Sequence, residues 1–483
     1  MTSERIETRN LIGGTFSDQG EGEAIEVRNP ATDEVIARVP NGAGKQARRA
    51  IEAAAAAFPS WSALTAAERA KPLHALALLM GRDVDRLARL LTLEQGKPLN
   101  EARGEIAYAA SFLDWAAEEG KRLYGQLVPA SHANKRILVM RQPVGVTACI
   151  TPWNFPAAMI TRKLGPALAT GCTMLVKPAE LTPLSAIAIA ELAQEAGIPA
   201  GVMNVITGDS KAIGKELFQN PSVKKVSFTG STEVGKLLIQ QAATNVTRLS
   251  LELGGHAPFL VFEDADIDAA VAGALAAKYR NAGQTCICAN RFYVQSAVYE
   301  EFATKLAAGA SALKIGDGLA PGVKVGPLIN DAAVTKMRDH IADAQDRGGK
   351  IRAGGKLASL GAGFAPRFYQ PTVVDGLTRD MLCAKEETFG PLSPIAKFDT
   401  EAEAIALAND SEFGLAAYFY TRDLGRTFRV AEQLEYGIVG ANDGGPSIAQ
   451  APFGGVKQSG YGREGGHWVM SEYTNVKYVS VGI

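Results

Sequence analysis

The stretch Val146-Thr-Ala-Cys-Ile-Thr-Pro-Trp-Asn-Phe-Pro156 decides the fold, because a short apolar run leads straight into a polar turn. Similar β-type runs recur through residues 144–262, and helical patterns separate them. The runs begin at Val146, Thr173, Val202, Lys225 and Pro258, and the helical patterns cover about 157–170, 183–196, 211–219 and 231–243. Alternation at this spacing predicts βαβ units and a parallel sheet that is buried on both faces.

The segments on either side extend this organisation. Two turn clusters around β-rich runs predict a hairpin region at 11–39, and an Ala-, Leu-, Arg- and Glu-rich pattern predicts helices from 44 to 118. Residues 134–143 predict a strand that leaves this helical layer, and a second α/β stretch follows Gly254. The last residues, 475–481, alternate strictly. A terminal strand of this kind lies along the sheet edge of a partner chain or closes the chain's own sheet.

Composition and charge exclude several classes of protein. A chain of 483 residues is too long for one core, so we expect two or three domains. Fifty basic and fifty-one acidic residues give no electrostatic reason to bind nucleic acid or an anionic membrane. The chain has no apolar run of about 18 residues, and its first ten residues lack the apolar core of a secretory signal. Five cysteines make no secreted disulfide framework, so we expect a cytoplasmic protein.

The segment Asn281-Ala-Gly-Gln-Thr-Cys-Ile-Cys288 carries the strongest chemical signal. Two of the five cysteines stand one residue apart beside glycine and small polar residues, which suits an accessible loop. A thiol in this setting is a nucleophile, a metal ligand or half of a disulfide. Metal binding is disfavoured, because no third or fourth ligand lies nearby in the sequence.

Three more patterns place polar groups at the ends of expected strands. Asn154 stands at a strand-to-helix turn, Glu252 ends a strand beside Gly254-Gly255, and Phe228–Gly235 forms a strand, a turn and a helix start. Open parallel sheets bind ligands at the carboxyl ends of their strands. The alternatives are turn chemistry for Asn154 before Pro156, a solvated loop charge for Glu252, and a domain hinge for the glycine pair.

Together with Lys177-Pro-Ala-Glu, Glu386–Pro391 and Pro452–Gly460, these patterns resemble the NAD(P)-dependent aldehyde dehydrogenase superfamily from about residue 10 onward. The resemblance implies an α/β fold with a Rossmann-type parallel-sheet cofactor domain (1–118 and 140–253) and an α/β catalytic domain (254–445). It also implies a small β oligomerisation arm (119–139 and 464–483), a homodimer or homotetramer, and a terminal strand that pairs with a partner chain.

The resemblance assigns the chemistry to three residues. Cys286 would attack the aldehyde carbon to give a thiohemiacetal and then, after hydride transfer, a thioester. The Asn154 side-chain amide and the Cys286 backbone N–H would form the oxyanion hole. Glu252 would activate the water that hydrolyses the thioester to a free acid. A non-catalytic, NAD-binding structural protein is the competing interpretation, and the presence of all three residues disfavours it.

The resemblance also implies a nicotinamide cofactor and no metal. Lys177 and Glu180 would hold the adenosine ribose, where a carboxylate accepts hydrogen bonds from both hydroxyls and repels a 2′-phosphate, so NAD is favoured over NADP. The small residues Gly230, Ser231 and Gly235 would let the pyrophosphate approach a helix N-terminus. The other cofactor residues implied are Trp153, Glu387 and Phe389, the last two for the nicotinamide ribose and ring.

Within the superfamily, the chain most resembles succinate-semialdehyde dehydrogenases, through residues 281–291, 385–391 and 413–420. The implied substrate is a small aldehyde that carries a carboxylate, and Arg162 and Arg280 would bind that carboxylate. The alternative is that each arginine instead forms an ion pair with an acidic residue of the protein itself. The loop 442–451 departs from the usual pattern, although Ser447 stands near the position of a carboxylate-binding serine. A bulkier acid aldehyde, such as α-ketoglutaric semialdehyde, therefore stays open.

Cys288 has two interpretations. Residues i and i+2 of an extended chain lie near the upper limit of Cα separation for a disulfide, so a bond to Cys286 would be strained and easily reduced. Such a bond would act as an oxidation switch. In the alternative, Cys288 is a small packing residue behind the nucleophile.

Overall fold

A mainly parallel sheet forms around the stretch that begins at Val146, as the alternation predicts. The computed structural model describes residues 6–483. Its first sheet has the order β2-β1-β9-β8-β7-β10-β11-β21, in which the five strands from β9 to β11 run parallel. These strands are β7 (Val146–Ile150), β8 (Thr173–Lys177), β9 (Met203–Val205), β10 (Val223–Thr229) and β11 (Arg248–Glu252). Antiparallel strands flank them: β1 (Asn10–Ile12), β2 (Thr15–Ser17) and β21 (Gly460–Tyr461).

Helices connect these strands where the sequence predicts them, within one or two residues at most ends. They are α5 (Ala158–Thr170), α6 (Leu184–Glu195), α7 (Ser210–Gln219) and α8 (Thr232–Ala242). The predicted N-terminal helices are α1 (Gly44–Ala63), α2 (Ala66–Arg82), α3 (Val84–Gln95) and α4 (Leu99–Gly120). The predicted hairpin region is also confirmed, with β3 (Ile25–Arg28) paired to β4 (Val35–Val39) beside the β1–β2 hairpin.

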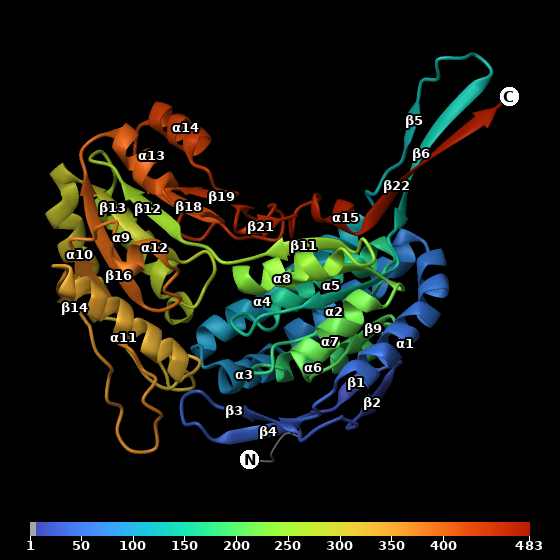
Figure 1. Ribbon diagram of the computed structural model, residues 1–483, viewed down its shortest axis with the longest axis horizontal. Helices are drawn as coiled ribbons and strands as arrows, with labels where there is room; N and C mark the ends of the chain where they lie inside the picture. The colour runs from blue at the N-terminus through green and yellow to red at the C-terminus, as the bar shows by residue number, and fades with distance from the viewer. Residues whose placement is uncertain (1–5) are drawn as a thin grey trace.

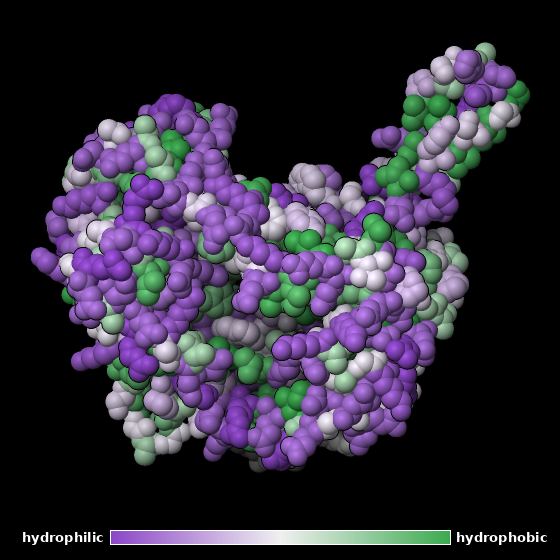
Figure 2. Space-filling view, viewed as in Figure 1, coloured by the Kyte–Doolittle hydropathy of each residue, from purple (hydrophilic) through white to green (hydrophobic). Residues whose placement is uncertain are grey.

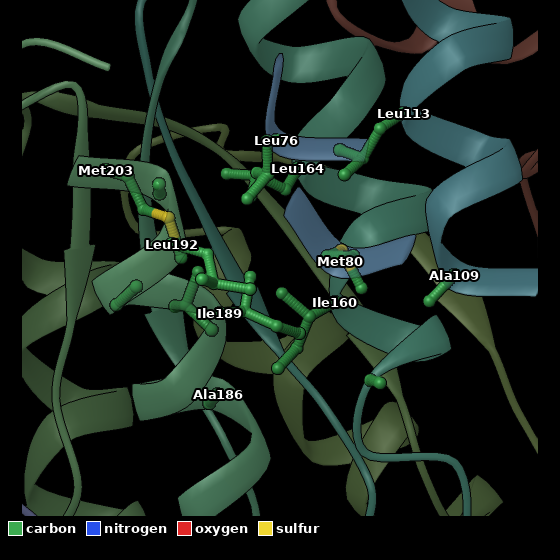
Figure 3. Close-up of a cluster of buried hydrophobic side chains, with 14 of the residues drawn as sticks. Leu76, Met80, Ala109, Leu113, Ile160, Leu164, Ala186, Ile189, Leu192 and Met203 are labelled. Atoms are coloured by element: carbon green, nitrogen blue, oxygen red, sulfur yellow. The ribbon is translucent and has the colours of Figure 1, made fainter. Parts of the chain in front are cut away.

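One hydrophobic cluster of this half lies between helices α2, α4, α5 and α6 (Figure 3). All thirteen residues of α5 are buried, and most of them are apolar; the charged exceptions are Arg162 and Lys163. Full burial of one Leu, Ile or Met side chain contributes roughly 1.5–3 kcal/mol. The cluster therefore anchors the helix that follows Asn154. Its labelled members are Leu76, Met80, Ala109, Leu113, Ile160, Leu164, Ala186, Ile189, Leu192 and Met203.

A second sheet holds the rest of the α/β pattern, in the order β14-β15-β16-β13-β12-β18-β19. All neighbours are parallel except β14 (Lys350–Ala353). The run at Pro258, which we grouped with the first alternation, belongs to this sheet, because Leu253–His256 carries the chain across from β11. The other strands are β12 (Ala257–Val261), β13 (Ala289–Gln295), β15 (Thr372–Asp375), β16 (Leu392–Phe398), β18 (Ala416–Tyr420) and β19 (Ile438–Ala441).

The helices of this second half surround its sheet (Figure 1). The longer ones are α9 (Ile267–Tyr279), α10 (Tyr299–Ser311), α11 (Asp331–Asp346), α13 (Glu401–Asn409) and α14 (Leu424–Gln433). The short elements are α12 (Leu382–Lys385), α15 (Val469–Glu472), η1 (Arg280–Gly283), η2 (Ser296–Val298), β17 (Phe413–Gly414) and β20 (Val456–Lys457). From Ile6 to the last residue, no helix is both long enough and apolar enough to span a bilayer. The space-filling view shows hydrophilic side chains over most of one face, with a hollow between the two halves (Figure 2).

A three-stranded arm projects from the body (Figure 1). It consists of β5 (Gln126–Val128), β6 (Lys135–Pro143) and β22 (Thr474–Gly482). We expected arm segments at 119–139 and 464–483, but residue 120 still belongs to α4, and Glu464 packs in the body. We also favoured pairing of the terminal strand with a partner chain. Within the chain from Ile6 onward, β22 pairs along its whole length with β6, as the alternative predicts, and its other edge is free for a partner strand.

Candidate active site

The sheet topology selects one place for a ligand. The chain order of the parallel strands reverses between β7 and β10, and open α/β sheets bind ligands at the carboxyl ends of such neighbours. A cavity of about 210 Å³ lies there, where the loops after β7 and β10 meet the loop before β13. Its lining residues are Pro152, Trp153, Asn154, Thr229, Gly230, Ser231, Leu253, Gly254, Cys286, Glu387 and Phe389.

Cys286 is half-buried and lines this cavity. Its loop passes so close to Gly255 that a Cβ there would clash with the Cys286 carbonyl oxygen. The glycine pair therefore allows close packing, beyond any role as a hinge. Burial raises the pKa of the Cys286 thiol to about 12, although the Arg162 guanidinium acts in the opposite direction. The sulfur is consequently a thiol at neutral pH and needs activation to attack a carbonyl.

The side-chain amide of Asn154 has a defined orientation. Its Nδ2 donates to the Gln284 carbonyl oxygen at 3.1 Å, and only an N–H can do so. The Asn154 carbonyl accepts from the Lys97 Nζ at 2.8 Å and from the Asn281 Nδ2 at 3.0 Å. One N–H of the Asn154 amide stays available, as an oxyanion donor requires. Asn154 therefore makes side-chain and backbone hydrogen bonds to distant parts of the chain, beyond those that a turn before Pro156 needs.

Glu252 ends β11 and is 3% exposed, so the alternative of a solvated loop charge is wrong. Within residues 6–483, neither of its carboxylate oxygens has a hydrogen-bond partner. Burial, followed by the nearby Glu464 carboxylate, raises the pKa of Glu252 well above its ordinary value. Arg162 and Lys163 oppose this shift. A buried, unpaired carboxyl with a raised pKa has the properties of a general base.

Arg162 occupies a different environment from the one we expected. The resemblance assigned it to the substrate carboxylate, but its guanidinium forms a buried ion pair with Glu464 and lies 3.9 Å from the centre of the Phe453 ring. Lys163 pairs with the same carboxylate at 2.5 Å. Arg162 lines neither cavity described in this section, and its contact with Glu464 is the ion pair within the protein that the alternative predicts. The sequence did not predict a role for Glu464, because its partners Arg162 and Lys163 lie about 300 positions earlier in the chain.

Five of the expected cofactor residues line the cavity. They are Trp153, Gly230, Ser231, Glu387 and Phe389. The Trp153 and Phe389 rings meet edge to face with centroids 5.6 Å apart, and Phe389 has a left-handed backbone (φ 53°) that is rare for a bulky residue. The Gly255 N–H donates to Glu387 at 3.2 Å, and burial raises the pKa of Glu387 to about 8.

The residues predicted to hold the pyrophosphate differ in position: Gly230 and Ser231 line the cavity, and Gly235 does not. Ser231 is the N-cap of α8, where its hydroxyl accepts from the Val234 N–H at 3.3 Å, so the helix N-terminus opens at the cavity. Gly235 lies outside the cavity lining, and a Cβ there would approach Leu253 to 2.6 Å. Gly235 thus permits close packing of α8 on the loop after β11. A small-residue turn, a helix N-terminus and an adjacent aromatic pair fit a dinucleotide.

Lys177 and Glu180 lie at the carboxyl end of β8, outside the cavity lining. The buried Lys177 Nζ contacts the Glu180 carboxylate at 2.5 Å, and both contact the Ser210 hydroxyl at the start of α7. Burial raises the pKa of Glu180, but the charge and hydrogen bond of Lys177 outweigh it and lower the pKa overall. Glu180 is therefore a carboxylate at neutral pH.

A second cavity of about 260 Å³ lies beside the first, against helix α4. Arg280 and Ser447 both line it, as the substrate assignment requires. The Ser447 and Tyr108 hydroxyls are 2.5 Å apart, and the Arg280 guanidinium lies 5.0 Å from the Phe155 ring centre. Sequence reasoning missed three further lining residues on α4. Their signal is the spacing of Glu101, Glu105 and Tyr108, which puts three polar side chains on one helical face.

Cys288 lies in the interior. It is fully buried, and its thiol donates to the Lys278 carbonyl oxygen at 3.4 Å. Both Cys286 and Cys288 are free thiols. This environment favours the packing interpretation over the oxidation switch. In the described part of the chain, no group of three or more His, Cys, Asp or Glu side chains is arranged to hold a metal ion.

Comparison with known proteins agrees with this geometry. The family model described as "Aldehyde dehydrogenase family" matches residues 16–479. The chain is 57% identical to the succinate-semialdehyde dehydrogenase (NADP(+)) GabD of Escherichia coli K12, over 98% of this chain and 97% of the relative. It is 56% identical to the glutarate-semialdehyde dehydrogenase of Pseudomonas aeruginosa, with the same coverage. A crystal structure of succinate-semialdehyde dehydrogenase from Burkholderia pseudomallei superimposes with a TM-score of 0.97 at 56% identity, over 99% and 98% of the two chains. The protein therefore belongs to the aldehyde dehydrogenase family.

Proposed function

We propose that this protein oxidises a carboxylated semialdehyde, most simply succinic semialdehyde, to the corresponding acid with NAD(P)+. One observation carries the proposal: the Cys286 thiol, the Asn154 amide and the expected nicotinamide residues Glu387 and Phe389 line a single cavity. A non-catalytic NAD-binding protein would need none of this arrangement around a cysteine. Family membership supports the same reaction class.

The first step in this proposal is attack of the Cys286 sulfur on the aldehyde carbon. The thiol proton passes to water as the sulfur attacks, because burial holds the pKa of Cys286 near 12 and the group starts as a thiol. The carbonyl oxygen then becomes an oxyanion that accepts hydrogen bonds from the free N–H of Asn154 and from the Cys286 backbone. Removal of one such donor typically lowers the rate by about 10²–10³-fold. The product is a thiohemiacetal on Cys286.

Collapse of the thiohemiacetal releases a hydride and leaves a thioester. A bound nicotinamide cofactor supplies the hydride acceptor, and Trp153, Gly230, Ser231, Glu387 and Phe389 would hold it. Glu252 would then remove a proton from water, and the resulting hydroxide would displace the Cys286 thiolate to release the acid. The raised pKa of the buried Glu252 makes the carboxyl basic enough for this task.

The neighbouring cavity supports an acidic substrate. Arg280 supplies the cation, and the hydroxyls of Ser447 and Tyr108 supply hydrogen bonds. The relatives named for succinate and glutarate semialdehyde also act on carboxylated aldehydes. A longer acid, such as glutaric or α-ketoglutaric semialdehyde, is the second candidate, because the loop 442–451, which contributes Ser447 to this cavity, departs from the usual pattern. We infer NAD as the preferred cofactor from the ionised Glu180, although the relative from Escherichia coli is named for NADP(+).

We further propose that a second copy of the chain covers the arm, which gives a homodimer or homotetramer. Apolar side chains are exposed along its strands, and the free edge of β22 offers unpaired backbone groups. Figure 2 shows this apolar surface on the projecting arm. The most exposed members are Leu127, Val476 and Tyr478.

The test is NADH or NADPH formation, followed by absorbance, with succinic, glutaric and α-ketoglutaric semialdehydes, acetaldehyde and benzaldehyde. We expect the highest kcat/KM with one of the acid aldehydes and no turnover by Cys286→Ala. Equal rates for wild type and Cys286→Ala would refute the enzyme assignment. A preference for neutral aldehydes would refute only the substrate class.

A further inference from the structure

A strained turn stands directly before the loop that carries Cys286. Three consecutive residues have left-handed backbones: Asn281 (φ 52°, ψ 36°), Ala282 (φ 55°, ψ 30°) and Gly283 (φ 76°). Residues with a Cβ avoid this region, Asn and Asp less than the others, and a run of them persists only where the surrounding structure forces it. At Gly283 a Cβ would also clash with the Gly390 carbonyl oxygen. The turn is thus held against its own conformational preference.

Hydrogen bonds from three directions hold the turn. The Asn281 N–H donates to the Glu101 carboxylate on α4 at 2.7 Å. The Gln284 Nε2 donates to the Asn281 carbonyl at 3.1 Å, and the Gln284 Oε1 accepts from the Ile329 N–H at 2.9 Å. Asn281 and Gln284 are both at most 1% exposed. These bonds hold the strained backbone in one conformation, and that conformation fixes the position of the Asn281 side chain.

That side chain joins the two segments of the candidate active site. The Asn281 Nδ2 donates to the Asn154 carbonyl at 3.0 Å and to the Gln284 carbonyl at 3.2 Å. The Gln284 carbonyl is the same oxygen that accepts from the Asn154 Nδ2 at 3.1 Å. Both hydrogens of the Asn281 amide are thus used within the protein, so none is left for a substrate.

We propose that Asn281 is a positioning residue that sets the distance and orientation between the Asn154 amide and the Cys286 sulfur. The inference rests on the proposed function, in which Asn154 donates to the oxyanion. Asn281 holds the Asn154 backbone from one side and the Gln284 carbonyl, which orients the Asn154 amide, from the other. A shift of about 1 Å in such a constellation lowers turnover by about 10²-fold.

The variant Asn281→Gly isolates this contribution. Glycine accepts a φ of 52° and keeps the N–H that bonds to Glu101, so only the side-chain amide is lost. We expect kcat to fall by about 10²-fold, while the KM for the aldehyde and the Kd for NADH stay near wild type. The matched control is Ala282→Gly, which relaxes the neighbouring left-handed residue without removing an amide, and we expect it to keep the wild-type kcat. A kcat for Asn281→Gly within twofold of that control would overturn the inference.

A double-mutant cycle distinguishes positioning from a general structural effect. If Asn281 acts through Asn154, Asn154→Ala and the double variant Asn154→Ala/Asn281→Gly share one kcat. Losses that multiply in the double variant contradict the inference. A wild-type kcat for Asn154→Ala would instead refute the proposed oxyanion role. If Asn281→Gly does not fold, the isosteric Asn281→Asp carries the same test, since Asp also tolerates a left-handed backbone.

Discussion

The hydroxyl oxygens of Tyr108 and Ser447 lie 2.5 Å apart, although the residues are separated by 339 positions in the chain. This contact ties the loop 442–451 to helix α4, and both residues line the cavity that Arg280 also lines. The sequence of that loop departs from the pattern usual in succinate-semialdehyde dehydrogenases. The sequence alone therefore did not establish whether Ser447 occupies the position of the carboxylate-binding serine. The hydrogen bond gives Ser447 a defined place opposite α4.

Arg280→Ala should separate acidic from neutral substrates. A charge-assisted hydrogen bond contributes enough for about a 10- to 100-fold rise in KM for succinic semialdehyde, whereas the KM for acetaldehyde should change little. Arg162→Ala is the matched comparison. Because Arg162 pairs with Glu464 and lines neither cavity, its loss should affect both substrates alike. Equal KM changes for the two aldehydes in Arg280→Ala would contradict the carboxylate assignment.

The free enzyme should show a thiol at position 286 rather than a thiolate. A folded pKa of about 12 for Cys286 means that the reactive anion becomes more abundant as the pH rises toward that value. We expect the rate of alkylation by iodoacetamide to increase about tenfold per pH unit between pH ~7 and ~9. Modification is followed by mass spectrometry, with Cys286→Ala as the control. A rate that levels off below neutral pH would show that another group lowers the pKa.

Glu180→Ser should change the choice of cofactor. The substitution removes a carboxylate that would repel a 2′-phosphate, and it frees the Lys177 ammonium from its present partner. We expect the ratio of kcat/KM for NADP over NAD to rise by roughly tenfold, equivalent to about 1.4 kcal/mol. Both cofactors are measured with the same aldehyde. An unchanged ratio would remove Glu180 as a determinant.

Cys288→Ala should leave oxidative inactivation unchanged. The Cys288 thiol is fully buried and donates to the Lys278 carbonyl, so we expect peroxide to act on Cys286 alone. Wild type and Cys288→Ala should therefore lose activity at the same rate and recover equally with dithiothreitol. Recovery in wild type but not in Cys288→Ala would instead support the oxidation switch.

The buried pair of Lys97 and Glu105 should matter for stability. The two charges lie 2.5 Å apart at no more than 1% exposure, and the second Glu105 oxygen accepts from the Ala157 and Ala158 N–H groups at the start of α5. Lys97→Met leaves the buried carboxylate without its counter-charge, which costs roughly 3–5 kcal/mol. Urea unfolding measures the loss. Lys305→Met, which breaks an exposed pair with Asp268, is the control and should leave the midpoint unchanged.

The alternation of apolar runs and helical patterns predicted the parallel strands of the first sheet, because burial on both faces makes each of them a short apolar run. It did not place the antiparallel strands β1, β2 and β21 at the edges of that sheet. It did not separate the run at Pro258 from that sheet, since periodicity carries no information on which sheet a strand joins. The same limit applies to the terminal strand. Its alternation predicted a sheet edge, and the β5–β6 hairpin of the same chain supplied that edge.

By itself, the sequence also predicted which residues carry the candidate chemistry. Cys286, Asn154 and Glu252 stand in local motifs. A local motif can be recognised from the sequence alone, because its residues are neighbours in the chain. Only the tertiary structure decided what surrounds them. It paired Arg162 with Glu464, joined Tyr108 to Ser447 and brought Asn281 against Asn154. The two residues of each contact are more than a hundred positions apart in the chain. Such a contact stabilises the protein only after both sheets have formed and brought the two residues together.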